Sequence, residues 1–565
     1  MGDVIVVESP TKARHIKHLL GPNYEVIPTV GHLKEMPAND IGIDYANQYE
    51  PKLQVIRGKG DVVNKIKATG EKAGRIILAT DPDREGEGIA FHLYEMLPVR
   101  IRSKCVRAEF HEITNEGILQ GLRQLRELDL NMAMAQQARR VIDRMTGYEV
   151  SPMLWRRLRG YKGLSAGRVQ SAALKLIYDR HQEIMAFKSK EYWTITGEFS
   201  SPPGSVFVTE LIQVNGQSLK EAPIASEDQA GEVLGHLQSS TFSIISLQDQ
   251  QKEYAPPPPF ITTSLLKASS SELGLGSKRT MKVAQELFEG IAVQGRQATG
   301  LITYMRTDSP RVSPEAQKQA REWIAEKYGE SFVQDKTKQY EAKEGAQDAH
   351  ECIRPTDLSI TPQSLRGSAS ADQLKLYSLI YTRFIVSQMA PAVHDERVLT
   401  ISGVDDSDYC TIFRGFSSRI VFKGWRILGG EGENRYQEGM AEIQESSSVK
   451  ARGFEAEQHR TKPPGRYTEA SLIDTLEKLG IGRPSTYAGI MDTLTGKEYV
   501  EIKQKSLNIT EIGIKVVETL IQCFPPVLDK EFTAAMERDL DRIATGEVPW
   551  HHVVKQLHEK IECAK

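Results

Sequence analysis

Hydrophobic positions follow a repeated order near the N-terminus. An apolar run at 4–7 leads to Glu8 and then to apolar residues at helical spacing, with Ser9 as the expected helix cap and Pro10 at the first helical position. The same order returns at 76–97, where an apolar run, an acidic loop and an amphipathic stretch follow one another. Strands and helices in alternation predict a parallel sheet covered by helices.

Beyond about residue 130 the patterns change in longer blocks. Period-two alternation at 192–255 and again at 392–452 predicts antiparallel strands, whereas the intervening and following stretches are mainly helical. We therefore expect a multidomain chain with α/β, α and β parts. The predicted domains are an α/β domain at 1–131, a helical domain from 132–198 plus 453–565, a β-rich arch from 199–260 plus 391–452, and a helical domain at 261–390.

Two chain crossings join the predicted β-rich arch to the helical domain at 261–390. One is EYAPPPPF at 253–260, a stiff and extended segment, and the other is the return near Ala390. Because they are the only crossings between these pieces of chain, they are the expected hinges for any relative motion.

Composition narrows the class of protein. The net charge is −3 over 565 residues, but 139–190 holds twelve Lys and Arg against four acids, an excess typical of a polyanion site or of a solvated helical face. The five cysteines form no CxxC pair, which favours reduced thiols over a disulfide framework or a zinc ribbon. Without a signal peptide or an apolar run of about 18 residues, we expect a cytoplasmic protein.

Acidic side chains follow both N-terminal strands. Glu8 ends the first, and Asp81, Asp83 and Glu85 follow the second. The carboxyl ends of parallel strands meet at one edge of a sheet, so these acids are expected to converge. Two carboxylates ~5 Å apart repel by about 3 kcal/mol at an effective dielectric of ~20, so a cation must compensate. All-oxygen ligands suit Mg²⁺, although a solvated capping loop explains any single one of these acids equally well.

The segment GLITYMRTDS at 300–309 carries a second kind of chemistry. In an extended segment, side chains two apart share a face, so Tyr304 and Arg306 would point into one site. A phenol beside a guanidinium is a plausible nucleophile for a phosphodiester, because the cation neutralises charge on the phosphate oxygens. A half-buried strand with a surface ion pair is equally compatible with these ten residues.

Eight motifs, taken in order, resemble those of the type IA DNA topoisomerases. They are ESPTKA at 8–13, GHL at 31–33, TDPDREGE at 80–87, ARRVIDRMTGYEVSP at 138–152, LSAGRVQS at 164–171, YMRTDS at 304–309, AHECIRPTD at 349–357 and LGIGRPSTYA at 479–488. ESPTKA and YMRTDS are similar to bacterial topoisomerase I (omega protein) rather than topoisomerase III. The resemblance implies a Toprim domain that holds the acids, joined to a toroid of helices and a β-arch through which a DNA strand passes.

The resemblance also implies roles for individual residues. Tyr304 would attack a phosphate to give a 5′-phosphotyrosine and a free 3′-hydroxyl, with Arg306 stabilising the transition state. Glu8 or Lys12 would serve the 3′-oxygen as general acid and base, and the sequence does not choose between them. His350 would contact a phosphate of the bound strand, although a lone histidine is more often structural. The Mg²⁺ ligands implied are Glu8, Asp81, Asp83 and Glu85, and they would hold the DNA end for religation.

A strand-binding groove is implied as well. Arginines would contact phosphates, while Tyr148 and Trp155 are available for base stacking, with a core role for Trp155 as the alternative. The DNA-binding residues implied are His32, Arg139, Arg140, Asp143, Arg144, Tyr148, Trp155, Ser165, Ala166, Gly167, Arg168, Gln170, Arg306, Asp308, Arg483 and Thr486.

We thus expect an isomerase that relaxes negatively supercoiled DNA at a single-stranded segment, in the bacterial cytoplasm in association with the nucleoid. No GxxxxGK[ST] occurs, so ATP is not expected, and a monomer without membrane contact is predicted. The chain stops at Lys565 without tetracysteine zinc ribbons, as expected of a truncated or a compact member. The alternatives are a topoisomerase III-like decatenase, a Toprim nuclease or primase without a covalent intermediate, and a DNA-binding or structural protein.

Overall fold

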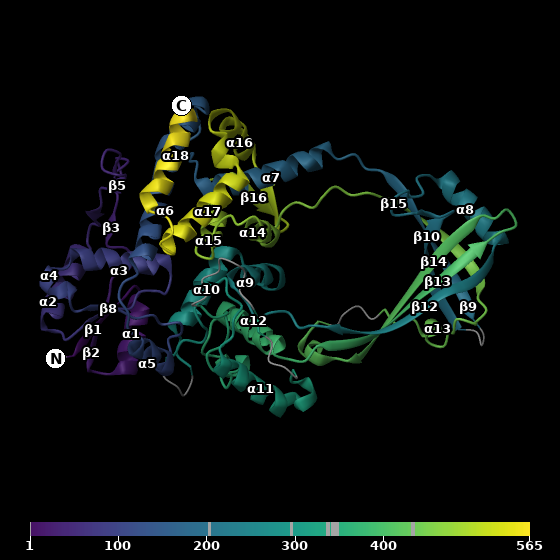
Figure 1. Cartoon of the computed structure of the whole chain (residues 1–565), viewed down its shortest axis with the longest axis horizontal. Helices are drawn as coiled ribbons and strands as arrows, with labels where there is room; N and C mark the ends of the chain where they lie inside the picture. Colours follow the sequence, from purple (N-terminus) through teal and green to yellow (C-terminus); the bar gives the residue numbers. More distant parts are fainter. Residues whose placement is uncertain are drawn as a thin grey trace.

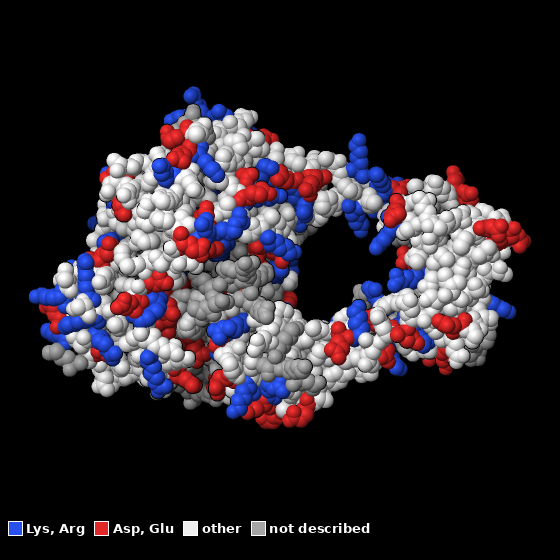
Figure 2. Space-filling model, viewed as in Figure 1, with Lys and Arg blue, Asp and Glu red and all other residues white. Residues whose placement is uncertain are grey.

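The computed structural model describes residues 2–201, 205–293, 298–334, 339–340, 350–430 and 435–564. Figure 1 shows a broad group of helices and a small sheet on one side, a long twisted sheet on the other, and two arms between them. In Figure 2 the side chains leave an open hole between the arms. The chain therefore forms a ring, as the predicted toroid requires.

The N-terminal lobe is built on a four-stranded parallel sheet. Its strands are β1 (Asp3–Val7), β2 (Tyr24–Pro28), β7 (Ile76–Leu78) and β8 (Cys105–Arg107), in the order β2-β1-β7-β8. Helix α1 (Pro10–Leu20) follows β1 and α3 (Arg84–Met96) follows β7, and α2 (Gly60–Lys72) is the third main helix. The predicted cap is confirmed, because Ser9 Oγ accepts from the amides of Thr11 and Lys12, and Pro10 begins α1.

The helical lobe joins two distant parts of the chain in one apolar core. The long helix α6 (Leu130–Arg157) and α7 (Arg168–Ala186) pack with five helices from the C-terminal part. These are α14 (Glu469–Lys478), α15 (Tyr487–Gly496), α16 (Glu511–Cys523), α17 (Lys530–Ala544) and α18 (Trp550–Ala564). No helix within the described ranges is both long and apolar enough to cross a bilayer.

The β-arch is one antiparallel sheet drawn from both strand-rich parts of the chain. Its order is β12-β13-β14-β10-β9-β15, with β11 (Gln217–Ser218) paired to β10. The strands are β9 (Glu191–Ser201), β10 (Ser205–Val214), β12 (Thr241–Tyr254), β13 (Ala392–Val404), β14 (Cys410–Phe422) and β15 (Lys450–Arg460).

The strands of the arch cross two of the predicted boundaries. β9 and β15 pair along their whole length, so 191–198 and 453–460 lie in the sheet and not in the helical domain to which we assigned them. The alternation of apolar and polar residues begins near 192, several residues before the predicted end of the helical segment at 198. The remaining boundaries stay predictions.

The tyrosine lobe lies between the arch and the N-terminal lobe (Figure 1). Its helices are α9 (Thr262–Ala268), α10 (Ser277–Glu289), α11 (Pro314–Tyr328) and α12 (Ala371–Ser387). One apolar core runs across both lobes, since Ile5 and Val7 of β1 belong to the same cluster as Phe288 and Met305. The two lobes are therefore closed on each other.

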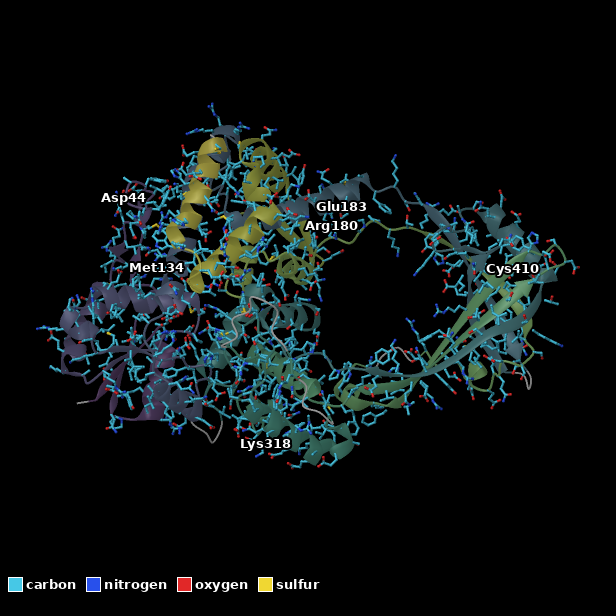
Figure 3. All side chains as sticks on the ribbon, viewed as in Figure 1. Asp44, Met134, Arg180, Glu183, Lys318 and Cys410 are labelled. Carbon is cyan, nitrogen blue, oxygen red and sulfur yellow. The ribbon has the colours of Figure 1, made fainter. Side chains whose placement is uncertain are left out.

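Two arms connect the arch to the rest of the ring. In one arm, Thr461 donates its amide to Lys190 O at 2.8 Å, and Arg180 Nη1 donates to Gly465 O at 2.6 Å. Figure 3 places Arg180 and Glu183 of α7 beside the hole. The other arm carries the two predicted hinge segments at 253–260 and near Ala390.

The second arm contains a third segment besides the two predicted hinges. A 3-10 helix, η4 (Gly424–Leu428), follows β14 and folds back onto the tyrosine lobe. Trp425 donates its Nε1–H to Tyr254 O at 2.9 Å and its amide to Ala390 O at 3.0 Å. Gly424 has φ +48°, and a Cβ there would lie 2.2 Å from Pro391 O, so only glycine permits this approach. The joint is therefore held by three segments and not by two.

Candidate active site

Tyr304 lies on an irregular extended segment that is fixed through its backbone. Its amide donates to His111 O at 2.9 Å, and the amide of Thr303 donates to Arg354 O at 3.0 Å. Only 2% of Tyr304 is exposed, and its hydroxyl donates to Asp83 Oδ2 at 2.7 Å. Arg306 Nη1 lies 3.3 Å from the same oxygen. Tyr304 and Arg306 thus converge on one carboxylate of the N-terminal lobe.

Two rings cover the Tyr304 side chain. Phe288 meets it edge-on at 5.3 Å between centroids, and His350 stacks on it at 5.7 Å. Burial, followed by the charge of Asp83, raises the pKa of Tyr304 well above its usual 10. Burial alone would raise the pKa of Asp83 too, but Arg306, the Gly86 amide and the Tyr304 hydroxyl together lower it. In this arrangement the phenol is protonated, and its O–H donates a hydrogen bond to the charged carboxylate of Asp83.

Three of the predicted acids gather around this contact. Lys12 Nζ lies 2.9 Å from Asp81 Oδ1 with both side chains buried, and the amide of Asp81 donates to Glu8 Oε1 at 3.2 Å. Burial, then Asp81 and Asp83, raises the pKa of Glu8 to about 8. Glu85 is the exception, because it pairs with His32 instead.

The acidic side chains of this cluster are the candidate ligands for a metal ion. Within the described ranges, no three His, Cys, Asp or Glu side chains are arranged as a cage for a cation. Asp81 is engaged by Lys12, and Asp83 by Tyr304 and Arg306. Burial first, and then the charges of Asp81 and Asp83, raise the pKa of Glu8, and a cation beside these acids would lower it. Mg²⁺ needs only one or two protein carboxylates beside water and phosphate oxygens, so the chemistry of this cluster fits it.

A buried arginine that sequence reasoning missed holds the acidic loop in place. Arg107, at the end of β8, is fully buried and donates to the carbonyls of Leu78, Thr80 and Asp81 at 2.8 to 2.9 Å. Glu87 Oε2 accepts from its Nε at 2.9 Å. The carbonyls belong to the chain that carries Asp81 and Asp83. Nothing in the sequence marks Arg107, although Glu87 stands out as an additional acid in DREGE.

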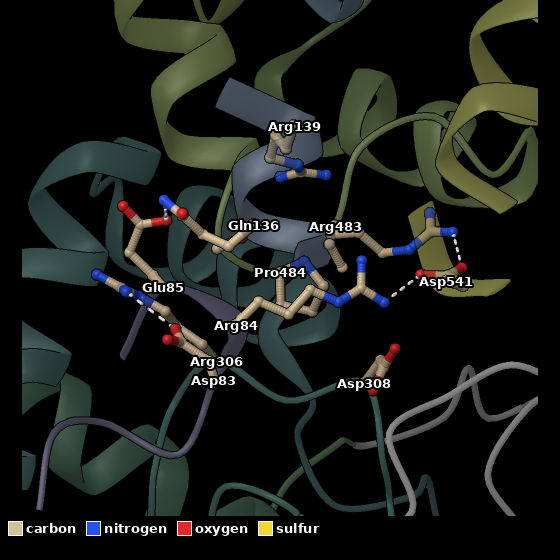
Figure 4. Close-up of a pocket in the computed structure, with 12 residues that line it drawn as sticks. Asp83, Arg84, Glu85, Gln136, Arg139, Arg306, Asp308, Arg483, Pro484 and Asp541 are labelled. Carbon is tan, nitrogen blue, oxygen red and sulfur yellow. Dashed lines mark hydrogen bonds and ion pairs between the residues drawn. The ribbon is translucent and has the colours of Figure 1, made fainter. Parts of the chain in front are cut away.

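A small cavity lies where the lobes meet, beside Asp83 (Figure 4). Its volume is about 60 Å³, enough for a few water molecules but far below the several hundred Å³ of a typical ligand pocket. Asp541 of α17 accepts from both Arg84 and Arg483, as Figure 4 shows. The lining residues are Asp83, Arg84, Glu85, Ala135, Gln136, Arg139, Arg306, Asp308, Arg483, Pro484, Ser485 and Asp541. Arg84 and Asp541 were not among the predicted residues.

The predicted groove arginines fall into two groups. Arg140 and Arg144, four residues apart on α6, donate to the carbonyls of Lys34 and Pro37 at 3.1 Å each. Tyr148, four residues further, donates to Ala38 O at 2.5 Å and lies under the Arg144 guanidinium. These side chains form a stripe along one face of the helix, with the 34–38 segment beside them.

Arg139 and Arg168 instead share one buried carboxylate. Each lies 2.6 Å from Glu537, which has no exposed surface. Burial alone would raise the pKa of Glu537, but Arg139, Arg168 and Arg483 lower it to about 2. Arg168 is 1% exposed and also faces Asp143 at 3.6 Å, so it cannot reach a phosphate in this arrangement. The phosphate contact expected of Arg168 is therefore not what the structure shows, because its ion pairs bury it.

The loop at 164–167 is held by side chains from both parts of the helical lobe. The amide of Ser165 donates to Tyr499 Oη at 2.8 Å, and that of Ala166 to Ser151 Oγ at 3.0 Å. Trp155 donates its Nε1–H to Leu164 O at 2.7 Å and is 52% exposed. The core role that we considered for Trp155 is therefore wrong. Gly167 and Gln170 follow directly at the start of α7, where Gly167 is the N-cap.

The remaining predicted residues are placed as follows. His350 is buried against Tyr304. Asp308 lies in the lining of the cavity. Thr486 Oγ1 accepts from the Arg483 amide at 2.8 Å, so it orients the turn that presents Arg483.

Comparison with known proteins agrees with this geometry. The family model described as DNA topoisomerase matches residues 127–555, and that described as Toprim domain matches residues 3–113. Among solved structures, the chain is similar to full-length topoisomerase I from Thermotoga maritima, with 35% identity and a TM-score of 0.85. That match covers 99% of this chain and 90% of the other.

The pair formed by Arg107 and Glu87 allows a stability test. Glu87→Gln leaves the buried Arg107 without its charge partner and also removes the pair of Glu87 with Arg126, so we expect a loss of about 3 kcal/mol in the free energy of unfolding of the N-terminal lobe. Urea denaturation, read out by hydrogen exchange at β7, measures it. The control is Glu71→Gln, which breaks the exposed pair with Arg100 and should change stability by less than about 1 kcal/mol. Equal effects of the two substitutions would contradict the role given to Arg107.

Proposed function

Because the chain belongs to the type IA DNA topoisomerases, we propose that it cuts one DNA strand by transesterification to Tyr304 and reseals it after strand passage. DNA is the substrate of this family. The observation that carries the proposal is the hydrogen bond from Tyr304 to Asp83, which brings a nucleophile of one lobe onto the acidic loop of another. The hole in Figure 2, with lysines and arginines on its rim, offers a passage for the second strand.

The proposed cleavage balances one bond against another. The Tyr304 hydroxyl passes its proton to Asp83, its hydrogen-bond acceptor at 2.7 Å, and its oxygen forms a bond to phosphorus while the bond to the 3′-oxygen breaks, which leaves a 5′-phosphotyrosine and a free 3′-hydroxyl. In this proposal Arg306, 3.3 Å from Asp83, neutralises the phosphate oxygens. Glu8 or Lys12, both of which contact Asp81, gives a proton to the departing 3′-oxygen and takes it back on religation. One phosphodiester replaces another, so we propose that no ATP is consumed.

The acid cluster is the proposed metal site. Toprim domains generally bind metal ions, and Glu8, Asp81, Asp83 and Glu85 are the residues that we propose would hold Mg²⁺. When bound, the ion supplies the positive charge that keeps the cleaved end in place. His32 would have to release Glu85, and Lys12 would have to share Asp81, for all four acids to face one cation.

Strand passage requires the tyrosine lobe to move. Tyr304 is buried, and the cavity beside it is too small for a nucleotide. On one side the lobe shares an apolar core with the N-terminal lobe. On the other, Leu266 lies in the core of the helical lobe, and Lys278 pairs with Asp492 at 2.9 Å and Lys267 with Asp474, ion pairs worth about 0 to 1 kcal/mol each. We propose that the lobe swings on the joint at Tyr254, Ala390 and Trp425, in a monomer that relaxes negative supercoils.

Tyr304→Phe is the direct test of the nucleophile. The substitution removes the attacking oxygen and leaves the ring, so we expect no covalent adduct and binding of single-stranded DNA within about twofold of the unmodified protein. Denaturing gels of labelled oligonucleotides measure the adduct, and peptide mapping locates it. Tyr328→Phe, in the same lobe, serves as the control. A nuclease without a covalent intermediate would still cut after Tyr304→Phe.

Metal and nucleotide requirements give a second test. We expect a negatively supercoiled plasmid to be relaxed with Mg²⁺ and without ATP, whereas a chelator should leave some cleavage but block complete relaxation. Agarose gels separate the topoisomers, and catenated circles in parallel reactions report decatenation. Relaxation that is indifferent to the chelator would remove the metal assignment, and decatenation without relaxation would favour a topoisomerase III-like activity.

A further inference from the structure

An unusual surface segment follows the long helix α6. Residues 155–163, WRRLRGYKG, contain four cations, two aromatic residues and no acid, in a chain whose net charge is −3. Every one of these nine residues is exposed except Leu158, which is half-buried. Of this segment, only Trp155 belongs to the residues that we expected to bind DNA.

The cations of this segment differ from those of the active site. Arg139, Arg168 and Arg483 are each paired with a carboxylate. By contrast, no hydrogen bond or ion pair joins the side chains of Arg156, Arg159 or Lys162 to any residue that the structure describes. The side chain of Arg157 donates a hydrogen bond only to the neutral Gln522, at 3.2 Å. A phosphate could therefore bind them without displacing an acid.

The two aromatic rings are exposed and fixed at their edges. Trp155 is tied to Leu164 O, so its orientation is set while its surface stays open. Tyr161 is 41% exposed, and Lys515 Nζ donates to its hydroxyl at 3.0 Å. Rings held in this way lose little conformational entropy when a base stacks on them.

The segment continues the stripe of the groove. Gln136 lines the active-site cavity, and Arg140, Arg144 and Tyr148 follow along α6 at four-residue spacing. From Gln136 to Trp155 the helix rises about 28 Å at ~1.5 Å per residue. At ~3.4 Å per stacked nucleotide this distance corresponds to about eight nucleotides.

We propose that residues 155–163 form a further binding site for single-stranded DNA, which holds the strand about eight nucleotides from the cleaved phosphate. Arg156, Arg159 and Lys162 bind phosphates, and Trp155 and Tyr161 stack on bases. The proposal rests on the proposed function, because it extends the groove that leads to Tyr304. Charge and exposed rings together favour a nucleic acid over an acidic protein, which offers no bases to stack.

The test compares binding across oligonucleotide lengths. In a Tyr304→Phe background, fluorescence anisotropy measures the affinity for single strands of 6 to 20 nucleotides at 50 to 200 mM salt. The triple variant Arg156→Ala/Arg159→Ala/Lys162→Ala should bind strands longer than about 10 nucleotides about tenfold more weakly, with 6-mers unchanged within about twofold. Loss of three contacts, each worth ~0.7, should reduce the salt slope for long strands by about 2.

Two further variants make the result specific. Lys72→Ala/Lys318→Ala/Lys327→Ala removes three exposed cations elsewhere, including Lys318 on the tyrosine lobe (Figure 3), and should bind every length as the background does. Tyr161→Leu should weaken binding of long strands without changing the salt slope. The triple variant Arg156→Ala/Arg159→Ala/Lys162→Ala is called the loop variant. If it matches the control at every length, the site does not bind DNA, and an acidic protein becomes the partner to test.

Failure of this inference is separable from failure of the proposed function. With Tyr304 intact, the loop variant should form covalent adducts on short strands as the unmodified protein does. No adduct with either protein would overturn the role of Tyr304. Adducts with both proteins, and no effect of the loop variant on long strands, would overturn only the further site.

Discussion

The hydrogen bond from Tyr304 to Asp83 joins two lobes that, in the proposed cycle, part for DNA to pass. A hydrogen bond to a charged group contributes about 1.5 to 3 kcal/mol, so it is small beside the apolar core shared by the two lobes. Its importance is therefore geometric. It fixes where the proposed nucleophile, Tyr304, lies relative to Asp81 and Glu8, so both lobes contribute to the site when they are closed on each other.

The local features of the N-terminal lobe could be predicted because they depend on short stretches of sequence. The order of strand, acid, cap and helix is written within about fifteen residues, and the parallel sheet then brings Glu8 and Asp81 together. Tyr304 and Arg306 lie two residues apart, and they meet at Asp83 although their segment is no regular strand.

Partners from distant segments could not be predicted. Arg107 reads as an ordinary charged residue at the end of a strand, and only the fold shows it buried against Glu87 and the loop carbonyls. Arg168 lies within a motif whose composition suggests phosphate binding, but Glu537, more than 300 residues away, pairs with it inside the protein. Hydrophobic periodicity predicts which residues of a segment face the core, but it does not predict which distant residues pair with each other. Trp425 at the joint was missed for the same reason.

Shared carboxylates explain how so many arginines lie beside one another before DNA arrives. Glu537 holds Arg139 and Arg168, and Asp541 holds Arg84 and Arg483, so each acid neutralises only one of two guanidinium charges. The trio of Asp541 keeps one net positive charge at a fixed position, whereas Asp143, 3.6 Å from Arg168, is a second acid beside Glu537. In the proposed cycle this lowers the repulsion among the cations while the lobes are closed, and it leaves charge available for a phosphate.

Apolar burial holds the tyrosine lobe on both of its sides. Apolar burial joins it to the N-terminal lobe, and on the other side Leu266 lies in the core of the helical lobe, beside ion pairs such as that of Lys278 with Asp492. Salt weakens exposed pairs but hardly affects apolar burial. For the proposed cycle, the apolar contacts on both sides therefore set the main energetic cost of opening and favour reclosure. Reclosure returns Tyr304 to Asp83, the arrangement in which a broken strand can be resealed.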